Sequence, residues 1–337
     1  MNENRQPRGF ARVGVIGAGA WGTALANVAA RAGHTVDLWG RDTKQIEALC
    51  KERVNTLHLP DIRLEQAVAP THDMHTIHQA DLVLAVVPTQ SLRNVLRVFA
   101  PMLKNTAPLV ICAKGIEIGS GLFVSEIARK IIPQQPVAVL SGPSFAHDVA
   151  RGLPTAVTIA ATDSRAAERI GAALPTPTFR LYHTDDLRGV EIGGAAKNVL
   201  AIACGIAAGR GLGASAGAAL VARGFAELSR FGRAFGARSE TLMGLSGLGD
   251  LVLTCGSTQS RNFALGVALG KGATLADARA GKLAEGAFTA SGILELAQRQ
   301  QIDMPIAQAV DAVLSGKLSI DGAVDALMTR PQRGEAS

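Results

Sequence analysis

Apolar and polar positions divide the chain into two halves with different periodicity. In the first half, short runs rich in β-branched residues lie at 11–17, 35–39, 67–71, 82–87, 109–113, 137–140, 156–160 and 178–182. Between them lie segments such as 91–103, 122–132 and 163–174, in which apolar residues recur with helical spacing. Apolar strands joined by helices belong to a parallel sheet that helices cover on both faces. We therefore predict an α/β fold for this half.

The strand pattern stops near residue 187, and only helical patterns follow. They lie at 187–208, 216–235, 261–269, 275–280, 291–300, 305–314 and 320–327. Each domain of such a chain is long enough to bury its own core. We therefore expect a sheet domain over residues 1–188 and an all-α domain over residues 189–337, with the first of these helices at the seam.

A glycine motif marks the junction of the first strand and the first helix. Gly17, Gly19 and Gly22 form G-x-G-x-x-G within V-I-G-A-G-A-W-G. The first glycine permits the tight turn, the second lets a pyrophosphate approach the backbone, and the third lets helix and strand pack closely. The helix N-terminus then faces the anion. The strand, turn and helix together predict a Rossmann-type dinucleotide-binding domain.

The end of the second strand bears on the choice of cofactor. An acid for the ribose 2′-hydroxyl is usual about 20 residues after the glycines, but here Arg41 stands at that place. A guanidinium pairs well with a 2′-phosphate, so Arg41 favours NADP over NAD. Asp37, inside the strand, and Asp42, one position late, are the competing acids.

One lysine interrupts an otherwise small and apolar helical segment, V-E-I-G-G-A-A-K-N-V-L-A-I. Gly193 and Gly194 precede Lys197 by four and three positions, on the face over which its stem leans. Two mid-helix glycines cost roughly 1 kcal/mol each relative to alanine. We interpret them as a hollow for a small ligand beside a partly desolvated amine, whose pKa burial lowers toward the range of proton transfer.

Further candidates follow the ends of strands, where ligands bind in parallel sheets. Lys114 follows the strand at 109–113 and is interpreted as a cation near nicotinamide and substrate. Ser144 follows the strand at 137–140, and we expect it to cap the helix that begins at Phe145 and Ala146. For Lys114, the alternative interpretation is an exposed loop lysine. For Ser144, it is a helix cap whatever the function of the protein.

The helical half adds a carboxylate and an anion site. Asp250 follows Gly247 and Gly249, so we expect a flexible turn to present it to a substrate hydroxyl or to Lys197; a helix cap is the alternative. Ser260, Arg261 and Asn262 open a helix, and its free amides together with these side chains would bind a phosphate. A capped helix with an exposed arginine is the alternative there.

Composition excludes several classes of protein. The net charge is +6, but lysine and arginine are scattered, so no nucleic-acid-binding tail is expected. The four cysteines form no metal or redox motif and indicate small buried residues in a reducing compartment. The amino end has no apolar signal sequence, and the longest charge-free apolar run, 198–209, is shorter than the about 20 residues that span a bilayer. We expect a cytoplasmic protein without stable membrane insertion and without a bound metal.

Six segments also occur in an order and spacing that together are highly specific. They are G-V-I-G-A-G-A-W-G-T-A-L-A, C-A-K-G-I-E, L-S-G-P-S-F-A, G-G-A-A-K-N-V-L-A-I, G-L-G-D-L-V-L-T-C and S-R-N. Nearly the whole chain thereby resembles the bacterial-type NAD(P)-dependent glycerol-3-phosphate dehydrogenases. The resemblance implies reversible hydride transfer between NAD(P)H and dihydroxyacetone phosphate, which gives sn-glycerol 3-phosphate, a precursor of phospholipids.

The resemblance also implies roles for particular residues. It makes Lys197 the catalytic acid/base. It places in the substrate site Lys114, Gly142, Ser144, Asp250, Ser260, Arg261 and Asn262. It places against the cofactor Ala20, Trp21, Arg41, Lys114, Ala146, Arg261, Leu283 and Glu285. The partner is then a small phosphorylated substrate, and a homodimer is possible.

Three other functions stay open at this point. A β-hydroxyacid or 6-phosphogluconate type dehydrogenase also joins a Rossmann half, a helical half and a helical lysine, although the S-R-N corner favours a phosphate over a bare carboxylate. A non-catalytic NADP-sensing module would leave Lys197 without purpose. A membrane-bound flavin-dependent glycerol phosphate oxidase would normally have an acid where Arg41 stands.

Overall fold

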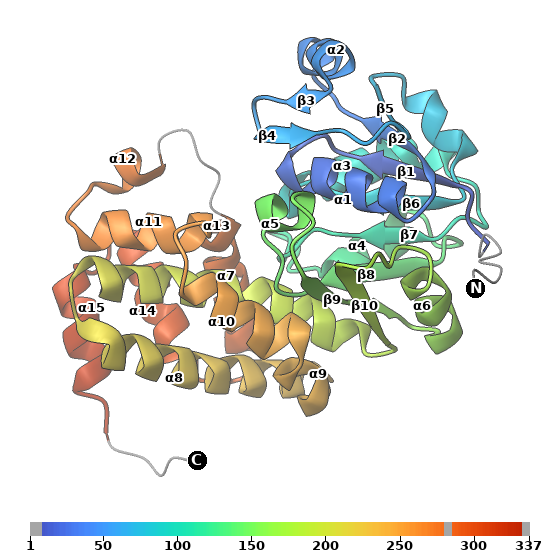
Figure 1. Cartoon of the computed structure of the whole chain (residues 1–337). Helices are drawn as coiled ribbons and strands as arrows, with labels where there is room; N and C mark the ends of the chain where they lie inside the picture. Colours follow the sequence, from blue (N-terminus) through green and yellow to red (C-terminus); the bar gives the residue numbers. More distant parts are fainter. Residues whose placement is uncertain (1–8, 280–284, 332–337) are drawn as a thin grey trace.

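The protein, described here from a computed structural model, has a sheet half and a helical half joined by one long helix (Figure 1). The structure describes residues 9–279 and 285–331. The sheet half contains α1 (Ala20–Arg31), α2 (Thr43–Glu52), α3 (Thr89–Phe99), α4 (Val124–Ile131), α5 (Ala146–Ala150) and α6 (Ser164–Gly171), with 3-10 turns η1 (Met74–Gln79) and η2 (Ala100–Met102). The fold class predicted from the sequence is confirmed.

Eight strands form the main sheet, in the order β10-β9-β8-β7-β6-β1-β2-β5. They are β1 (Arg12–Ile16), β2 (Thr35–Trp39), β5 (Val68–Thr71), β6 (Leu82–Ala85), β7 (Leu109–Ile111), β8 (Val137–Ser141), β9 (Thr155–Ala161) and β10 (Phe179–Thr184). Side chains alternate between its faces: Val13 and Val15 of β1 point into the core that contains α1, whereas Ile16 points into the core that contains α3 and α4.

Two features of this half depart from the expectation of a purely parallel sheet. β8 and β9 pair antiparallel. Their connection contains only the five-residue helix α5, which packs against α1, so it is not the covering helix that a parallel crossover requires. In addition, a separate antiparallel hairpin, β3 (Val54–Asn55) with β4 (Leu59–Arg63), follows α2.

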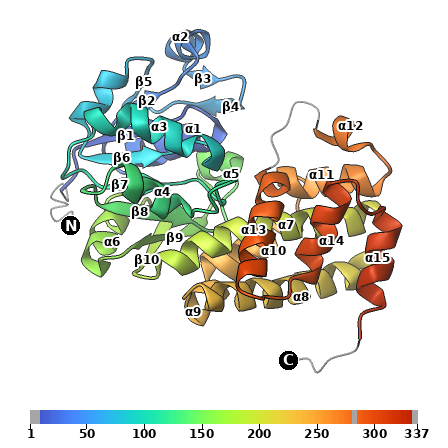
Figure 2. The same cartoon turned by 180° about the vertical axis from the view of Figure 1, so that it is seen from behind.

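The helical half surrounds α7 (Leu187–Gly209), as Figure 2 shows from behind. Its other helices are α8 (Gly213–Ala234), α9 (Ser239–Met243), the π-helical segment η3 (Leu245–Gly249), α10 (Asp250–Cys255), α11 (Arg261–Gly270), α12 (Leu275–Arg279), α13 (Glu285–Arg299), α14 (Pro305–Leu314) and α15 (Ile320–Met328). Asp186 caps α7, because its carboxylate accepts a hydrogen bond of 2.8 Å from the Gly189 amide.

Glycines set the closeness of the contact between α7 and α11. A side chain at Gly205 would collide with the carbonyl oxygen of Phe263, and one at Gly266 would collide with that of Ile202. Gly209 and Gly270 repeat the arrangement one turn later. These positions explain part of the high glycine content, since only glycine allows two helix backbones to approach so closely.

The helix α7 is longer than the charge-free apolar run 198–209 from which no membrane span was expected. The whole 23-residue helix is long and apolar enough to cross a membrane, but 83% of its most apolar 18-residue window is buried inside the protein. A buried core helix has the same composition as a membrane span. The expectation for the cysteines also needs one correction, since Cys112, Cys204 and Cys255 are buried but Cys50 is exposed.

Candidate active site

A buried carboxylate between two lysines forms the centre of the site. Asp250, 1% exposed, pairs with Lys197 and with Lys114, whose Nζ lies 2.7 Å from its Oδ2. Lys197 comes from α7, Asp250 begins α10, and Lys114 follows β7, so both halves of the protein contribute. Lys114 Nζ also donates a hydrogen bond of 3.1 Å to the Gly142 carbonyl oxygen, beyond β8. The candidate catalytic lysine therefore lies at the seam.

Burial sets the protonation of Lys197. Its side chain is 8% exposed, and desolvation lowers its pKa to about 7, opposed by the negative charge of Asp250 and helped by the positive charge of Lys114. A lysine whose pKa is near 7 converts readily between ammonium and amine at neutral pH. The environment therefore suits acid/base chemistry in both directions.

The expectation of a hollow beside Lys197 is wrong, because protein atoms fill the space next to the two glycines. A Cβ at Gly193 would collide with the Ser246 carbonyl oxygen and lie 2.9 Å from the Gly247 Cα. A Cβ at Gly194 would lie 2.8 Å from the Ser141 Oγ and 3.3 Å from the Lys114 Cγ. The glycines thus let η3 and the Lys114 side chain approach α7, and they offer no space to a ligand.

The expectation of a flexible turn before Asp250 is wrong as well. The segment L-S-G-L-G is the π-helix η3, and it continues directly into α10. Wide π-helical turns occur often at functional sites. Here the turn packs on Gly193 through the buried Ser246 and Gly247 and delivers Asp250 to Lys197 from a regular segment. The ion pair between these two side chains agrees with one of the two partners expected for Asp250.

The dinucleotide turn has the geometry that its glycines predict. Gly17 has φ +119°, and a Cβ there would collide with the Val86 carbonyl oxygen. A Cβ at Gly22 would collide with the Gly17 carbonyl oxygen. Gly19 instead has no atom within 4 Å of a Cβ position and caps α1 without a side-chain hydrogen bond. The turn therefore leaves open space before the first amides of α1, where Ala20 and Trp21 lie, and this fits a pyrophosphate.

The acids that compete with Arg41 have other partners. Asp37 is 3% exposed and pairs with Arg12 at 2.6 Å. Asp42 caps α2 by accepting a hydrogen bond of 3.0 Å from the Gln45 amide. Arg41 is exposed directly after β2 and Gly40. Asp42 is exposed too, but its carboxylate is engaged in the cap, so the guanidinium of Arg41 is the group that this edge offers to a ligand.

Gly142 and Ser144 lie beyond β8, next to Lys114. Gly142 has φ +145°, and a Cβ there would lie 2.9 Å from the Val157 Cα, so the position requires glycine. Ser144 does not cap α5 as expected. Its hydroxyl donates a hydrogen bond of 3.0 Å to the Gly142 carbonyl oxygen, and Phe145 stands at the cap position.

The S-R-N corner begins α11, as predicted. Ser260 caps the helix by accepting a hydrogen bond of 3.2 Å from the Phe263 amide. The Asn262 side chain donates to Asn198 Oδ1 at 3.0 Å and accepts from the Gly286 amide at 2.9 Å, so both its polar groups are engaged inside the protein. Arg261 is exposed and faces His58 of the β3–β4 hairpin, whose pKa is lowered mainly by desolvation and also by Arg261.

The remaining cofactor candidates are described only in part. Ala146 is half-buried at the start of α5, which packs against α1. Glu285 is the first residue of α13, and Leu283 lies outside the described residues.

Two polar residues next to the site were missed from the sequence. Asn198 follows Lys197 and ties α7 to Asn262. Thr254 lies one turn after Asp250, and its hydroxyl donates a hydrogen bond of 3.4 Å to the Asp250 carboxylate. The spacing of four residues between Asp250 and Thr254 was an available signal, whereas the position of Asn198 directly after Lys197 gave none.

Comparisons with known proteins agree with this geometry. The family model for the NAD-dependent glycerol-3-phosphate dehydrogenase N-terminus matches residues 12–167, and the model for its C-terminus matches residues 186–325. The chain belongs to this family. An NAD(P)+ glycerol-3-phosphate dehydrogenase of Azorhizobium caulinodans is 61% identical to it over 327 residues, which cover 97% of this chain and 99% of that protein.

Other members of the glycerol-3-phosphate dehydrogenase family are similarly close. The NAD(P)+ enzyme of Beijerinckia indica is 59% identical over 326 residues, covering 96% of this chain and 97% of that protein. The crystal structure of the Coxiella burnetii glycerol-3-phosphate dehydrogenase superimposes with a TM-score of 0.91 at 37% identity, covering 95% of this chain and 99% of that one. The similarity therefore extends over both halves, including the seam that holds Lys197.

Proposed function

We propose that the protein catalyses the NAD(P)H-dependent reduction of dihydroxyacetone phosphate to sn-glycerol 3-phosphate, and the reverse reaction. The observation that carries this proposal is the buried Lys197–Asp250 pair at the seam of a dinucleotide-binding half and a helical half, in a glycerol-3-phosphate dehydrogenase sequence. The alternative hydroxyacid and phosphogluconate activities have no comparable support from the close relatives.

Lys197 is the proposed catalytic acid/base. A bound nicotinamide supplies or accepts the hydride. As an ammonium, Lys197 gives a proton to the carbonyl oxygen of dihydroxyacetone phosphate, and as an amine it takes the proton from the alcohol of glycerol 3-phosphate. Asp250 favours the ammonium form, whereas burial and Lys114 favour the amine. These opposing effects keep the pKa of Lys197 at about 7, where ammonium and amine are both populated at neutral pH, as a reversible reaction needs.

The substrate residues are proposed around this lysine. Lys114, Gly142, Ser144 and Asp250 border one side, and their contacts with one another fix the site before ligand binds. Ser260, Arg261 and Asn262 hold the phosphate end, with Arg261 and the first amides of α11 as the donors that its geometry leaves available. Asn262 contributes through its backbone and through the position of the helix.

The cofactor is NAD or NADP, and we propose NADP as the preferred one because Arg41 is exposed at the ribose edge while Asp37 and Asp42 are engaged elsewhere. Gly17, Gly19 and Gly22 shape the pyrophosphate turn, and Ala20, Trp21, Lys114, Ala146, Arg261, Leu283 and Glu285 are the other proposed contacts. We also propose a soluble, cytoplasmic protein that forms a homodimer.

The decisive experiment compares the wild type with Lys197→Met. Absorbance at the nicotinamide band follows oxidation of NADPH and NADH with dihydroxyacetone phosphate. Loss of a positioned acid/base lowers rates about 10²- to 10⁴-fold, while NADPH binding, followed by fluorescence titration, should persist. Lys104→Met is the matched control. Lys104 lies away from the site, where its Nζ is 3.4 Å from Asp81 Oδ1, so this variant should retain turnover. Near-normal kcat in Lys197→Met would refute the role, and turnover of a β-hydroxyacid but not of dihydroxyacetone phosphate would refute the function.

A further inference from the structure

The helical half contains a cavity that the proposed reaction does not use. It has a volume of about 730 Å³ and lies between α8, α14 and α15, with the C-terminal part of α7 as its inner wall. Pockets that hold small ligands have volumes of about 300–1,000 Å³. Ala203, Ile206 and Ala207 of α7 line it, whereas Lys197 and Asp250 do not.

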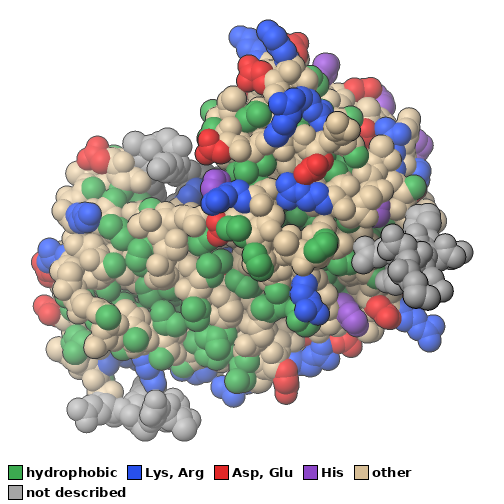
Figure 3. Space-filling model, in the orientation of Figure 1, with side chains coloured by type: hydrophobic (Ala, Val, Ile, Leu, Met, Phe, Trp, Pro, Cys, Tyr) green, Lys and Arg blue, Asp and Glu red, His purple; other side chains and the backbone are tan. Residues whose placement is uncertain are grey.

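The lining of the cavity is aliphatic. Leu220, Val313, Val324 and Leu327 are typical, and no aromatic side chain is present among the lining residues that the structure describes. A flat, conjugated ligand would find no ring on which to stack, whereas a flexible hydrocarbon chain needs only apolar area to be buried. Figure 3 shows that hydrophobic side chains are also frequent on the outer face of this half.

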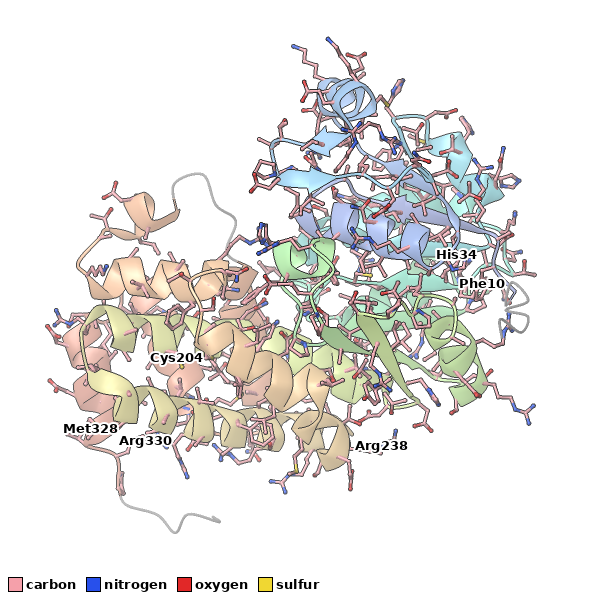
Figure 4. All side chains as sticks on the ribbon, viewed as in Figure 1. Phe10, His34, Cys204, Arg238, Met328 and Arg330 are labelled. Carbon is pink, nitrogen blue, oxygen red and sulfur yellow. The ribbon has the colours of Figure 1, made fainter. Side chains whose placement is uncertain are left out.

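Three arginines lie around the cavity. Arg230 donates a hydrogen bond of 3.1 Å to the Asp303 carbonyl oxygen, and Arg330 pairs with the Asp303 carboxylate at 2.5 Å. Figure 4 shows Arg330 close to Met328, whose side chain is 80% exposed at the end of α15. Arg223 is exposed and has no acidic partner among the described residues.

The acids of the cavity leave this positive charge uncompensated. The Asp303 carboxylate forms an ion pair with Arg330. Glu227 is 2% exposed and accepts hydrogen bonds of 2.7 and 3.3 Å from the amides of Ile306 and Ala307. Burial raises the pKa of Glu227 to about 7. Arg230 has the Asp303 carbonyl oxygen as its partner and also acts on Glu227, whose pKa its charge lowers. Arg223 is thus the cation of the three without a partner among the described residues, and it complements an anion.

We propose that this cavity binds a single-chain aliphatic amphiphile with an anionic head, of the long-chain fatty acid class. The chain lies against the apolar walls, and the carboxylate pairs with Arg223. A second copy of the protein fits less well, because a twofold contact uses the same patch on both copies. The two acids among the described lining residues, Glu227 and Asp303, are already engaged, so that patch offers Arg223 no carboxylate. The inner wall belongs to the helix of Lys197, so the bound chain lies against the back of the catalytic helix.

The test measures binding of radiolabelled palmitate to the full-length protein by equilibrium dialysis below the micelle concentration. Two variants are paired with controls. Val324→Trp fills the cavity, and Ala326→Trp adds the same ring on the exposed side of α15. Arg223→Glu reverses the charge, and Arg223→Lys keeps it.

We expect one saturable site per chain in the wild type. Binding should disappear in Val324→Trp and persist in Ala326→Trp. It should weaken about tenfold in Arg223→Glu, which corresponds to about 1.4 kcal/mol, and stay near wild type in Arg223→Lys. Hexadecanol, which has the chain without the charge, should compete poorly. Turnover of dihydroxyacetone phosphate without palmitate, measured on the same preparations, shows that each variant is folded, and it tests a different site.

Absence of saturable binding, or equal binding in Val324→Trp and wild type, would overturn the proposal. So would equal affinity in the two Arg223 variants, because the head would then not be held by charge. A wild-type dimer that becomes monomeric only in Val324→Trp, measured by light scattering after gel filtration, would show instead that a second copy covers the cavity.

Discussion

At the scale of single residues, the acid/base properties of Lys197 depend on two neighbours of opposite charge. Asp250 raises its pKa and Lys114 lowers it, against a larger lowering by burial. The pKa of about 7 predicts that kcat/KM for dihydroxyacetone phosphate reduction falls above pH 7, because the ammonium donor is lost, by up to tenfold per pH unit. The oxidation of glycerol 3-phosphate should rise over the same range.

Asp250→Asn tests the cause of this pH dependence. Removal of the carboxylate charge disfavours the ammonium, so the pKa of Lys197 should decrease and the falling limb of the reduction profile should move to lower pH. Thr254→Val, which removes only a hydroxyl in contact with Asp250, should shift the limb less. A limb that stays in place in Asp250→Asn would mean that another group titrates.

The proposed preference for NADP rests on Arg41, which is exposed directly after β2 and Gly40. Arg41→Ala should lower kcat/KM for NADPH about ten- to a hundredfold, because a hydrogen bond to a charged group contributes about 1.5–3 kcal/mol. The kcat/KM for NADH should change little. Lys44→Ala, another exposed cation nearby in α2, is the control. Steady-state kinetics with both cofactors measure this, and equal losses with NADPH and NADH would remove the 2′-phosphate contact from the proposal.

At the scale of elements, the contact between η3 and α7 positions Asp250. Gly193→Ala places a methyl group against the Ser246 carbonyl oxygen, so η3 must move away from α7. Overpacking of this kind costs typically 1–3 kcal/mol, and we expect that loss in the free energy of unfolding together with a lower kcat. Urea denaturation and turnover measure the two effects.

Gly217→Ala is the matched control, since this glycine of α8 has no atom within 4 Å of a Cβ position. Alanine there should stabilise the helix by about 0.4–1 kcal/mol and leave kcat unchanged. If Gly193→Ala behaved like Gly217→Ala, η3 would not be held by this contact.

The same contact explains where prediction from the sequence failed. Periodicity located the eight main strands and the helix of Lys197, because each buries its own apolar pattern. It did not show that Gly193 and Gly194 face protein and not ligand, since the atoms that fill the space come from Ser246 and Lys114, distant in sequence. The antiparallel pairing of β9 and the π-helical form of η3 likewise depend on tertiary contacts.

At the scale of the whole molecule, α7 belongs to the cores of both halves. Leu187 and Val190 pack in the core of the sheet half, whereas Ile192, Val199 and Ile206 pack in the core of the helical half. The sequence predicted a boundary at residues 188–189 and a helix at the seam. Because one helix packs in both cores, we expect the stabilities of the two halves to be coupled, and no local sequence pattern reveals this.

This sharing predicts that the two halves unfold together. The proposed cofactor contacts come largely from the sheet half, yet NADPH should raise the melting temperature of the entire chain in one transition. At a hundred times its Kd, a ligand adds about 2.7 kcal/mol to the stability of the folded state. Differential scanning calorimetry with and without NADPH measures this, and Arg41→Ala at the same NADPH concentration should show a smaller shift. Two transitions, of which NADPH moves only one, would show that the helical half unfolds independently and that α7 does not couple it to the sheet.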